Sequence, residues 1–131
     1  MSRVQLALNV SDLEKAVDYY GRLFDAEPAK RKPGYANFAI EQPPLKLVLI
    51  EKEDGGTINH LGVEVESIDS VRHAETRLLD DGVATTPEQG VCCYAEQDKV
   101  WTNDPDGVAW EVYTVLADAD SMERSAATAC C

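Results

Sequence analysis

Gln5-Leu-Ala-Leu-Asn-Val10 and His60-Leu-Gly-Val-Glu-Val65 are two hexapeptides, 55 positions apart, in which apolar residues alternate with polar or small ones. Such alternation is typical of a strand that buries one face. The match continues at the same offset, since Leu13 corresponds to Ile68 in the amphipathic segments that follow. The sequence therefore predicts an internal repeat in which each strand leads into a helix.

The ends of the two expected helices agree with this repeat. The first helix is expected to begin after an N-cap at Ser11 or Asp12, and the second after an N-cap near Ser67. Gly82 is expected to end the second helix, because glycine readily takes the left-handed conformation found after helix ends.

Three short strands are expected after each helix, separated by turn residues such as Asp104-Pro-Asp-Gly107. They cover residues 27–31, 35–40 and 45–51 in the first half, and 85–88, 99–102 and 109–115 in the second. The order βαβββ thus occurs twice, in an α+β domain of two modules at about 3–52 and 58–116. Residues 117–131 show no periodicity and are expected to form a flexible tail.

The composition limits the partners of this domain. Twelve Lys and Arg against 24 Asp and Glu give a net charge of -12 over 131 residues. Such an acidic surface repels phosphate backbones, so nucleic acid is not an expected partner. Nor does any apolar run approach the ~20 residues of a spanning helix, so we expect no membrane partner and a cytoplasmic protein.

Three polar residues in apolar strands suggest a metal site. Gln5 and His60 are equivalent in the repeat, so a pseudo-twofold axis would bring them together beside the small residues Ala7 and Gly62. Glu111 lies in another apolar strand, where a buried carboxylate needs a metal or a partner. We expect Gln5, His60 and Glu111 to be metal ligands and catalytic residues, with positions open for water, oxygen or substrate. The exposed face of the second helix holds the other histidine, His73, as a surface residue.

The donor atoms of this set narrow the metal without fixing it. An amide oxygen, an imidazole nitrogen and a carboxylate resemble the two-His-one-carboxylate set of non-haem Fe(II) oxygenases, with Gln in place of one His. Fe(II), Mn(II), Co(II) and Ni(II) all remain chemically possible.

The four cysteines form two adjacent pairs, Cys92-Cys93 and Cys130-Cys131, which is not the spacing of a disulfide framework. We expect free thiols at these positions. Successive strand residues point to opposite faces, so Cys92 and Cys93 can bind one ion together only where the backbone turns or bulges. A mobile loop over 89–96 is therefore expected.

The repeat and its polar residues resemble the vicinal oxygen chelate superfamily, which includes glyoxalase I, extradiol dioxygenases and bleomycin-resistance proteins. The resemblance extends over about residues 3–116 and implies the glyoxalase-like fold. The segments that carry it are 5–10, 59–65, 104–107 and 110–113.

A narrower set of segments is similar to the ArsI-type organoarsenical C–As lyases and the related CadI proteins. These segments are 30–39, 44–49, Cys92-Cys93 and 97–101. The resemblance implies an Fe(II) site that uses O2 to cleave trivalent organoarsenicals such as methylarsenite to arsenite. It also implies that Gln5, His60 and Glu111 hold the iron and that Cys92 and Cys93 bind arsenic. Tyr35, Asn37, Tyr94 and Trp101 are candidates to line the pocket.

Two other functions stay open from the sequence. A different metal-dependent enzyme of the superfamily, such as a glyoxalase-type isomerase, would need no cysteine pair. A non-enzymatic resistance protein that binds Cd(II) or As(III) would need cysteines but no iron. The sequence leaves undecided the preferred organoarsenical, a monomer or a homodimer, and the role of Cys130 and Cys131.

Overall fold

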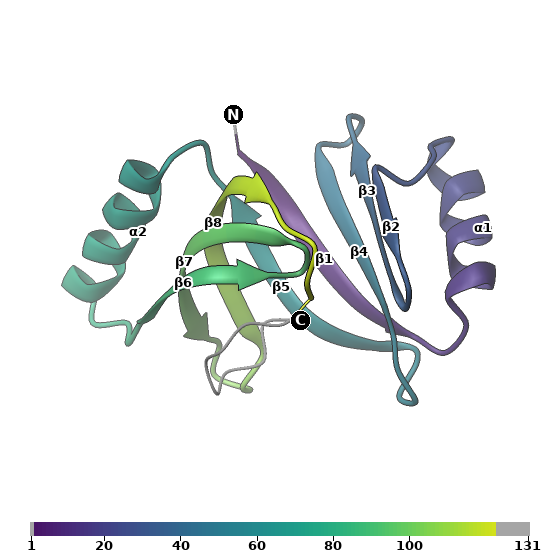
Figure 1. The fold of residues 1–131 in the computed structure, drawn as a ribbon. Coiled ribbons are helices and arrows are strands. Elements are labelled where there is room, and N and C mark those ends of the chain that lie inside the picture. Colours follow the sequence, from purple (N-terminus) through teal and green to yellow (C-terminus); the bar gives the residue numbers. More distant parts are fainter. Residues whose placement is uncertain (1, 123–131) are drawn as a thin grey trace. The chain divides into compact units, whose positions relative to one another are not determined.

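The computed structural model describes residues 2–122 (Figure 1). Along the chain the elements alternate as the repeat predicts, with one strand, one helix and three strands in each half. The elements are β1 (Arg3–Val10), α1 (Leu13–Phe24), β2 (Lys30–Lys32), β3 (Tyr35–Ile40), β4 (Leu45–Glu51), β5 (Thr57–Glu64), α2 (Ile68–Asp80), β6 (Thr86–Cys92), β7 (Ala95–Asn103) and β8 (Ala109–Asp118). The predicted βαβββ order is confirmed in both halves.

Within residues 2–122, the chain divides into two compact units, Arg3–Leu61 and the part from Gly62 onward with Ser2. The boundary falls inside β5, so the first unit holds β1, α1, β2, β3, β4 and the start of β5. The second unit holds the end of β5, α2, β6, β7 and β8. No helix of residues 2–122 is long and apolar enough to cross a membrane.

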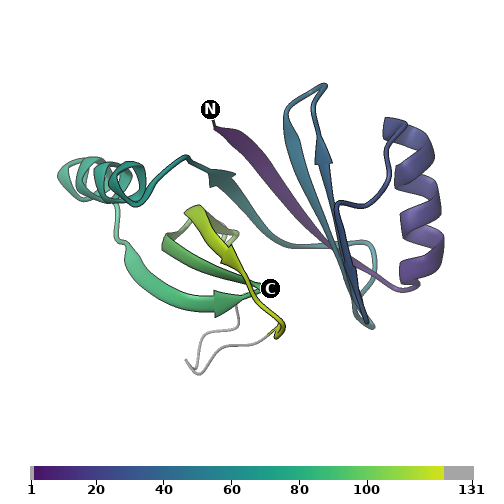
Figure 2. The same ribbon diagram turned by 45° about the horizontal axis from the view of Figure 1, so that its top comes forward.

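In the first unit, successive side chains of β1 lie on opposite faces of the sheet. The strand order is β2-β3-β4-β1-β5, with β1 parallel to β4 (Figure 2). Leu6 and Leu8 pack toward α1, on the apolar cluster around Phe38 and Leu47. Because side chains alternate along a strand, Gln5 then points to the face opposite α1. The apolar cluster therefore fixes the register that directs Gln5 away from the helix.

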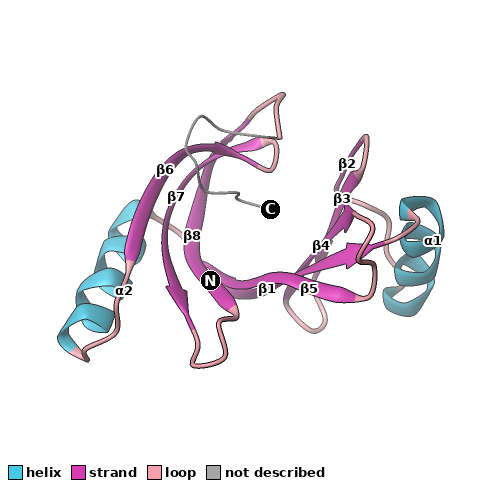
Figure 3. Ribbon diagram, turned by 90° about the horizontal axis from the view of Figure 1, so that it is seen from below, coloured by secondary structure: helices cyan, strands magenta, loops and turns pink. Residues whose placement is uncertain are grey.

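In the second unit, α2 packs on β7 and β8 (Figure 3). Asp98 of β7 forms an ion pair with Arg72 of α2, so this side of β7 faces the helix. Lys99 and Trp101 are odd-numbered residues of the part of β7 that follows the register shift between Glu96 and Gln97, and they point to the other side. Glu111 of β8 pairs with Trp101 in register and shares that side.

The expected loop over 89–96 is wrong. These residues form a tight antiparallel hairpin in which Cys92 pairs with Ala95. The two residues between them, Cys93 and Tyr94, have φ of 54° and 61°. Both values lie in the left-handed region, as the type I′ hairpin turn requires. The polar residues that flank the turn concealed its strands, so the expected spans 85–88 and 99–102 were too short.

Residues at the end of β8 and just beyond it support this turn. Left-handed backbone costs non-glycine residues about 1–2 kcal/mol each. The Cys93 N–H donates to the Met122 carbonyl at 2.9 Å, and the Tyr94 N–H donates to the Ser121 carbonyl at 3.1 Å. The expected tail began at residue 117, whereas β8 continues to Asp118. Residues 123–131 of that tail, with Cys130 and Cys131, lie outside the described residues.

The start of α1 gives a prediction for stability. The side chain of Asp12, not Ser11, accepts the Lys15 N–H at 3.1 Å and caps the helix. Asp12→Ala should lower the free energy of unfolding by about 1 kcal/mol, because it removes the acceptor of an otherwise unpaired N–H. Ser11→Ala is the matched control and should change it by less than about 0.5 kcal/mol. Urea unfolding measures both, and equal losses would contradict the assignment of the cap.

Candidate functional site

Gln5 and His60 meet in the first unit, as their equivalence in the repeat predicts. They lie on the neighbouring strands β1 and β5 and are 4% and 3% exposed. The Nε2 atoms of the two side chains are 3.1 Å apart. Two polar groups so deeply buried require partners, and this contact supplies one to each.

The contacts of His60 select one tautomer of its ring. The Gln5 amide Nε2 can only donate, so His60 Nε2 must accept and carries no proton. On the other side of the ring, His60 Nδ1 lies 2.8 Å from Asn59 Oδ1, which can only accept. Both contacts therefore place the proton on Nδ1. The bare Nε2 is the form in which histidine binds a metal.

A chain of hydrogen bonds continues from Asn59 to the linker between the halves. Asn59 Nδ2 donates to Asn9 Oδ1 at 2.9 Å, and Asn9 Nδ2 donates to Thr57 Oγ1 at 2.9 Å. The Thr57 hydroxyl donates to the Asp54 carbonyl at 2.6 Å. Because each amide is held at both ends, the Oδ1 of Asn59 is fixed toward His60. The sequence offered no signal for this role beyond the polar character of Asn9 and Asn59.

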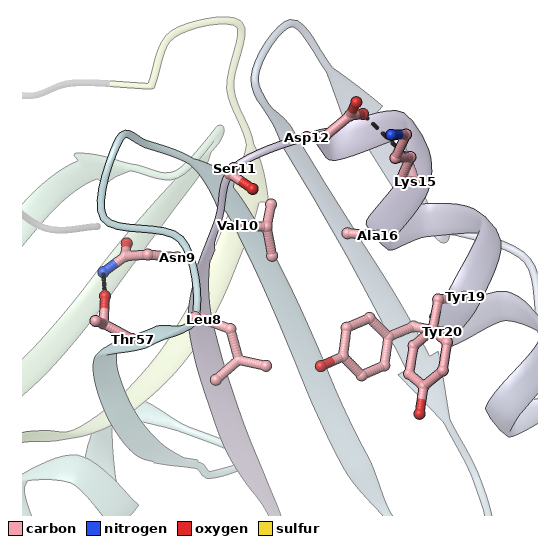
Figure 4. Close-up of a pocket in the computed structure, with 11 residues that line it drawn as sticks. Leu8, Asn9, Val10, Ser11, Asp12, Lys15, Ala16, Tyr19, Tyr20 and Thr57 are labelled. Carbon is pink, nitrogen blue, oxygen red and sulfur yellow. Dashed lines mark hydrogen bonds between the residues drawn. The ribbon is translucent and has the colours of Figure 1, made fainter.

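A cavity of about 430 Å³ lies next to this chain, between β1 and the start of α1 (Figure 4). Asn9 and Thr57 reach it from one side, and Tyr19 and Tyr20 of α1 from the other. None of the residues that line it is a predicted ligand or arsenic-binding residue. The cavity is therefore separate from the predicted chemistry.

Glu111 belongs to the second unit, where it is ion-paired with a buried lysine. Glu111 is 2% exposed, as is Lys99, and Lys99 Nζ lies 2.6 Å from Glu111 Oε1. Either charge alone would be costly to bury, and the pair offsets much of that cost. The same Nζ lies 3.6 Å from the sulfur of Cys92. Sequence reasoning missed Lys99, although a lysine in an alternating strand beside Trp101 is an available signal.

The hairpin turn brings the two described cysteines together. Their sulfur atoms lie 3.5 Å apart, and Cys92 is 1% exposed. The requirement for a turn at this pair is thus met, because the left-handed residues Cys93 and Tyr94 break the strand alternation. The expectation of free thiols is wrong for Cys92 and Cys93, since neither is a free thiol in the structure. The sequence could not show this, because adjacency alone does not specify an oxidation state.

The four candidate pocket residues are divided between the two units. Tyr35 and Asn37 of β3 are buried, and Asn37 Nδ2 donates to the Tyr35 hydroxyl at 3.1 Å. Tyr94 lies in the hairpin turn. Trp101 donates through Nε1 to Glu88 at 3.1 Å. Their expected role in lining a substrate pocket stays a prediction.

Comparison with known proteins identifies the family. Residues 3–112 match the model of the Glyoxalase/Bleomycin resistance protein/Dioxygenase superfamily. The chain belongs to this superfamily. It is 56% identical to the "Trivalent organoarsenical cleaving enzyme" of Thermomonospora curvata, over all of this chain and 89% of that protein. It is 63% identical to "Cadmium-induced protein CadI" of Mycobacterium tuberculosis (strain ATCC 25618 / H37Rv), over 93% of this chain and 82% of that one.

A solved structure confirms the superfamily fold. The Mn(II)-bound glyoxalase from Novosphingobium aromaticivorans has a TM-score of 0.65 and 18% identity, over 97% of this chain and 44% of that chain. The vicinal oxygen chelate fold expected from the two βαβββ modules is therefore confirmed. At this identity the likeness shows the fold alone.

The predicted ligand set of this superfamily member stays a prediction. Gln5 and His60 are in contact in one unit, and Glu111 lies in the other. Within residues 2–122, no group of three or more His, Cys, Asp and Glu side chains is placed to hold a metal ion. The predicted set contains only two residues of those types, since its third member is the amide of Gln5. His73, expected at the surface, is exposed on α2.

The tautomer of His60 can be measured directly. Long-range ¹H–¹⁵N spectra at mildly alkaline pH should show His60 with a protonated Nδ1 and a bare Nε2, because Asn59 and Gln5 impose this state. His73 is the internal control and should show the mixture usual for an exposed ring. Asn59→Ala should weaken the preference of His60 without affecting His73. A dominant Nε2–H form of His60 would contradict the assignment.

Proposed function

We propose that this protein is an Fe(II)- and O2-dependent lyase that cleaves the carbon–arsenic bond of trivalent organoarsenicals, with methylarsenite as a substrate. The observation that carries the proposal is that one chain holds both a buried Gln–His contact and two adjacent cysteines whose sulfurs lie 3.5 Å apart. The Thermomonospora curvata relative is named for the cleavage of trivalent organoarsenicals, and its likeness extends over the whole chain.

The described residues suit a first-row divalent metal. His60 presents a bare Nε2, and rotation of the Gln5 amide by half a turn directs its oxygen toward the same place. Glu111 supplies the negative charge, and a carboxylate can serve a lysine and a metal through its two oxygens. All three residues are at least 95% buried. We therefore assign Gln5, His60 and Glu111 as the residues that would hold Fe(II), which would bind and activate O2.

The chemistry of arsenic assigns a separate role to the cysteines. Trivalent arsenic is a soft ion that prefers sulfur ligands. Methylarsenite has two exchangeable hydroxyl groups, which the sulfurs of reduced Cys92 and Cys93 replace; each hydroxyl group leaves as water with the proton that its thiol gives up. The hairpin turn brings the two sulfurs within 3.5 Å of each other, as binding of a single arsenic atom requires. The methyl group keeps its bond to arsenic and stays free to react.

The overall reaction balances with one O2. Methylarsenite and O2 give arsenite and formaldehyde, in which carbon loses four electrons to oxygen and arsenic keeps its trivalent state. The chain must hold arsenic, exclude bulk water and orient the methyl group. Burial of Cys92 and of the proposed ligands suits the exclusion of water.

The first experiment separates the lyase from a protein that only binds Cd(II) or As(III). Reduced, Fe(II)-loaded protein should release arsenite from methylarsenite in air and none without O2. His60→Ala should lower the rate at least about 100-fold, because it removes the nitrogen ligand. His73→Ala is the matched control and should keep the full rate. Tight arsenic binding with no arsenite in air would contradict the lyase and favour the binding protein.

The second experiment tests the role of the cysteine pair. Cys92→Ser and Cys93→Ser should each lower the affinity for methylarsenite by at least about tenfold, because one thiolate cannot replace both hydroxyl groups. Fe(II) affinity should stay within about threefold, since neither cysteine is a proposed metal ligand. Anaerobic titration measures both constants. Unchanged arsenite release by the double variant would remove the cysteines from the mechanism and favour a different enzyme of the superfamily.

A further inference from the structure

The proposed mechanism gives no role to Lys99. Among the described residues of the second unit, Lys99 is the one cation on the face of the sheet that points away from α2. Its Nζ lies 2.6 Å from Glu111 Oε1 and 3.6 Å from Cys92 Sγ. All three side chains are at most 2% exposed. The ammonium group therefore lies between a proposed metal ligand and a proposed arsenic-binding sulfur.

Two aromatic rings help to hold this ammonium group in place. The rings of Trp101 and Tyr113 lie 5.3 Å and 5.7 Å from Lys99 Nζ, within the range of cation–π attraction. Trp101 is in turn held by Glu88, which accepts its Nε1–H at 3.1 Å. Tyr113 donates its hydroxyl to Glu64 at 3.1 Å. The ammonium group is thus surrounded by two aromatic rings, the Glu111 carboxylate and the Cys92 sulfur.

Charged and titratable groups approach Cys92 from β6, β7, β8 and the hairpin turn. Strand register places Glu88 of β6 on the same face as Cys92, opposite Lys99 of β7. Strand β8 contributes Glu111 and Tyr113, and the turn contributes Cys93. Arg72 of helix α2 does not face Cys92, because it pairs with Asp98 on the other face of β7. Lys99 is therefore the cation that acts on the Cys92 sulfur from these elements.

We propose that Lys99 is a positioning residue that holds the sulfur of reduced Cys92 as a thiolate and ties it to the carboxylate of Glu111. In an environment poor in water, the attraction of a nearby ammonium group stabilises a thiolate far more than it would in bulk water. The thiolate is also the form that attacks arsenic. Glu111 acts in the opposite direction, because its negative charge offsets part of the lysine's effect on the sulfur.

This inference rests on the proposed function only for its consequence, which is faster arsenic capture at neutral pH. The charge effect on Cys92 is a property of the reduced protein and needs neither metal nor arsenical. A test by alkylation can therefore fail while arsenite release succeeds, or the reverse, and the two failures are distinguishable.

The experiment measures how fast iodoacetamide alkylates Cys92 as a function of pH. The reduced full-length chain carries Cys93→Ser, so that Cys92 is resolved from Cys130 and Cys131 by peptide mass spectrometry. Lys99→Met should slow alkylation at neutral pH about tenfold and move the pH midpoint upward, because the stabilising charge is lost. Lys99→Arg keeps the charge and should restore most of the rate. Lys52→Met, at an exposed lysine of the first unit, is the matched control and should change nothing.

A second variant keeps the test decisive if Lys99→Met fails to fold. Glu111→Gln removes the competing negative charge, so it should move the midpoint of Cys92 alkylation to lower pH. A merely structural role of Lys99 would change accessibility at every pH and leave the midpoint in place. An unchanged midpoint in folded Lys99→Met, or an unchanged or higher one in Glu111→Gln, would overturn the proposal.

Discussion

Polar side chains that are buried on strands of this fold must satisfy one another's hydrogen bonds and charges. Gln5, His60 and Glu111 are each at least 95% buried, although all three side chains are polar. A polar group removed from water without a partner costs on the order of 1–3 kcal/mol. The partners of these three side chains hold them in one orientation, and that arrangement is the physical argument for function.

The same constraint operates differently in the two units. In the first unit, neutral amides hold the imidazole of His60 in one tautomer, so the nitrogen proposed to bind the metal is left bare without any charged partner. In the second unit, the charges of Lys99 and Glu111 offset each other in a dry environment. A neutral shell preserves the basicity of a ligand, whereas an ion pair fixes the direction of a carboxylate. The chain thus combines two modes of support on a repeated scaffold.

Much of the fold could be predicted from the sequence because the repeat aligns strands and helices of matching periodicity. The contact of Gln5 with His60 followed from that repeat, since both occupy one position in it. The hairpin at 92–95 could not be predicted, because its turn contains Cys93 and Tyr94 in place of the glycine and asparagine usual at left-handed positions. The role of Lys99 was missed for a related reason. Burial of a lysine depends on partners from β6 and β8, which local patterns do not show.

For the cysteine pair, the sequence predicted the backbone turn but not the oxidation state of the sulfurs. Adjacency predicted that a turn was needed, and the structure supplies one. The oxidation state of Cys92 and Cys93 is a property of their surroundings, and arsenic capture requires reduced sulfurs. Reduction must therefore precede capture, and thiol–disulfide exchange with a small thiol is the reaction that would supply the electrons.

X-ray absorption at the iron edge of the reduced, Fe(II)-loaded protein would identify the atoms bound to the metal. We expect nitrogen and oxygen neighbours only, with the spectral contribution of a single imidazole that disappears in His60→Ala and persists in His73→Ala. Sulfur in the first coordination shell, or an imidazole signature that survives the loss of His60, would contradict the assignment of Gln5, His60 and Glu111 as the metal ligands.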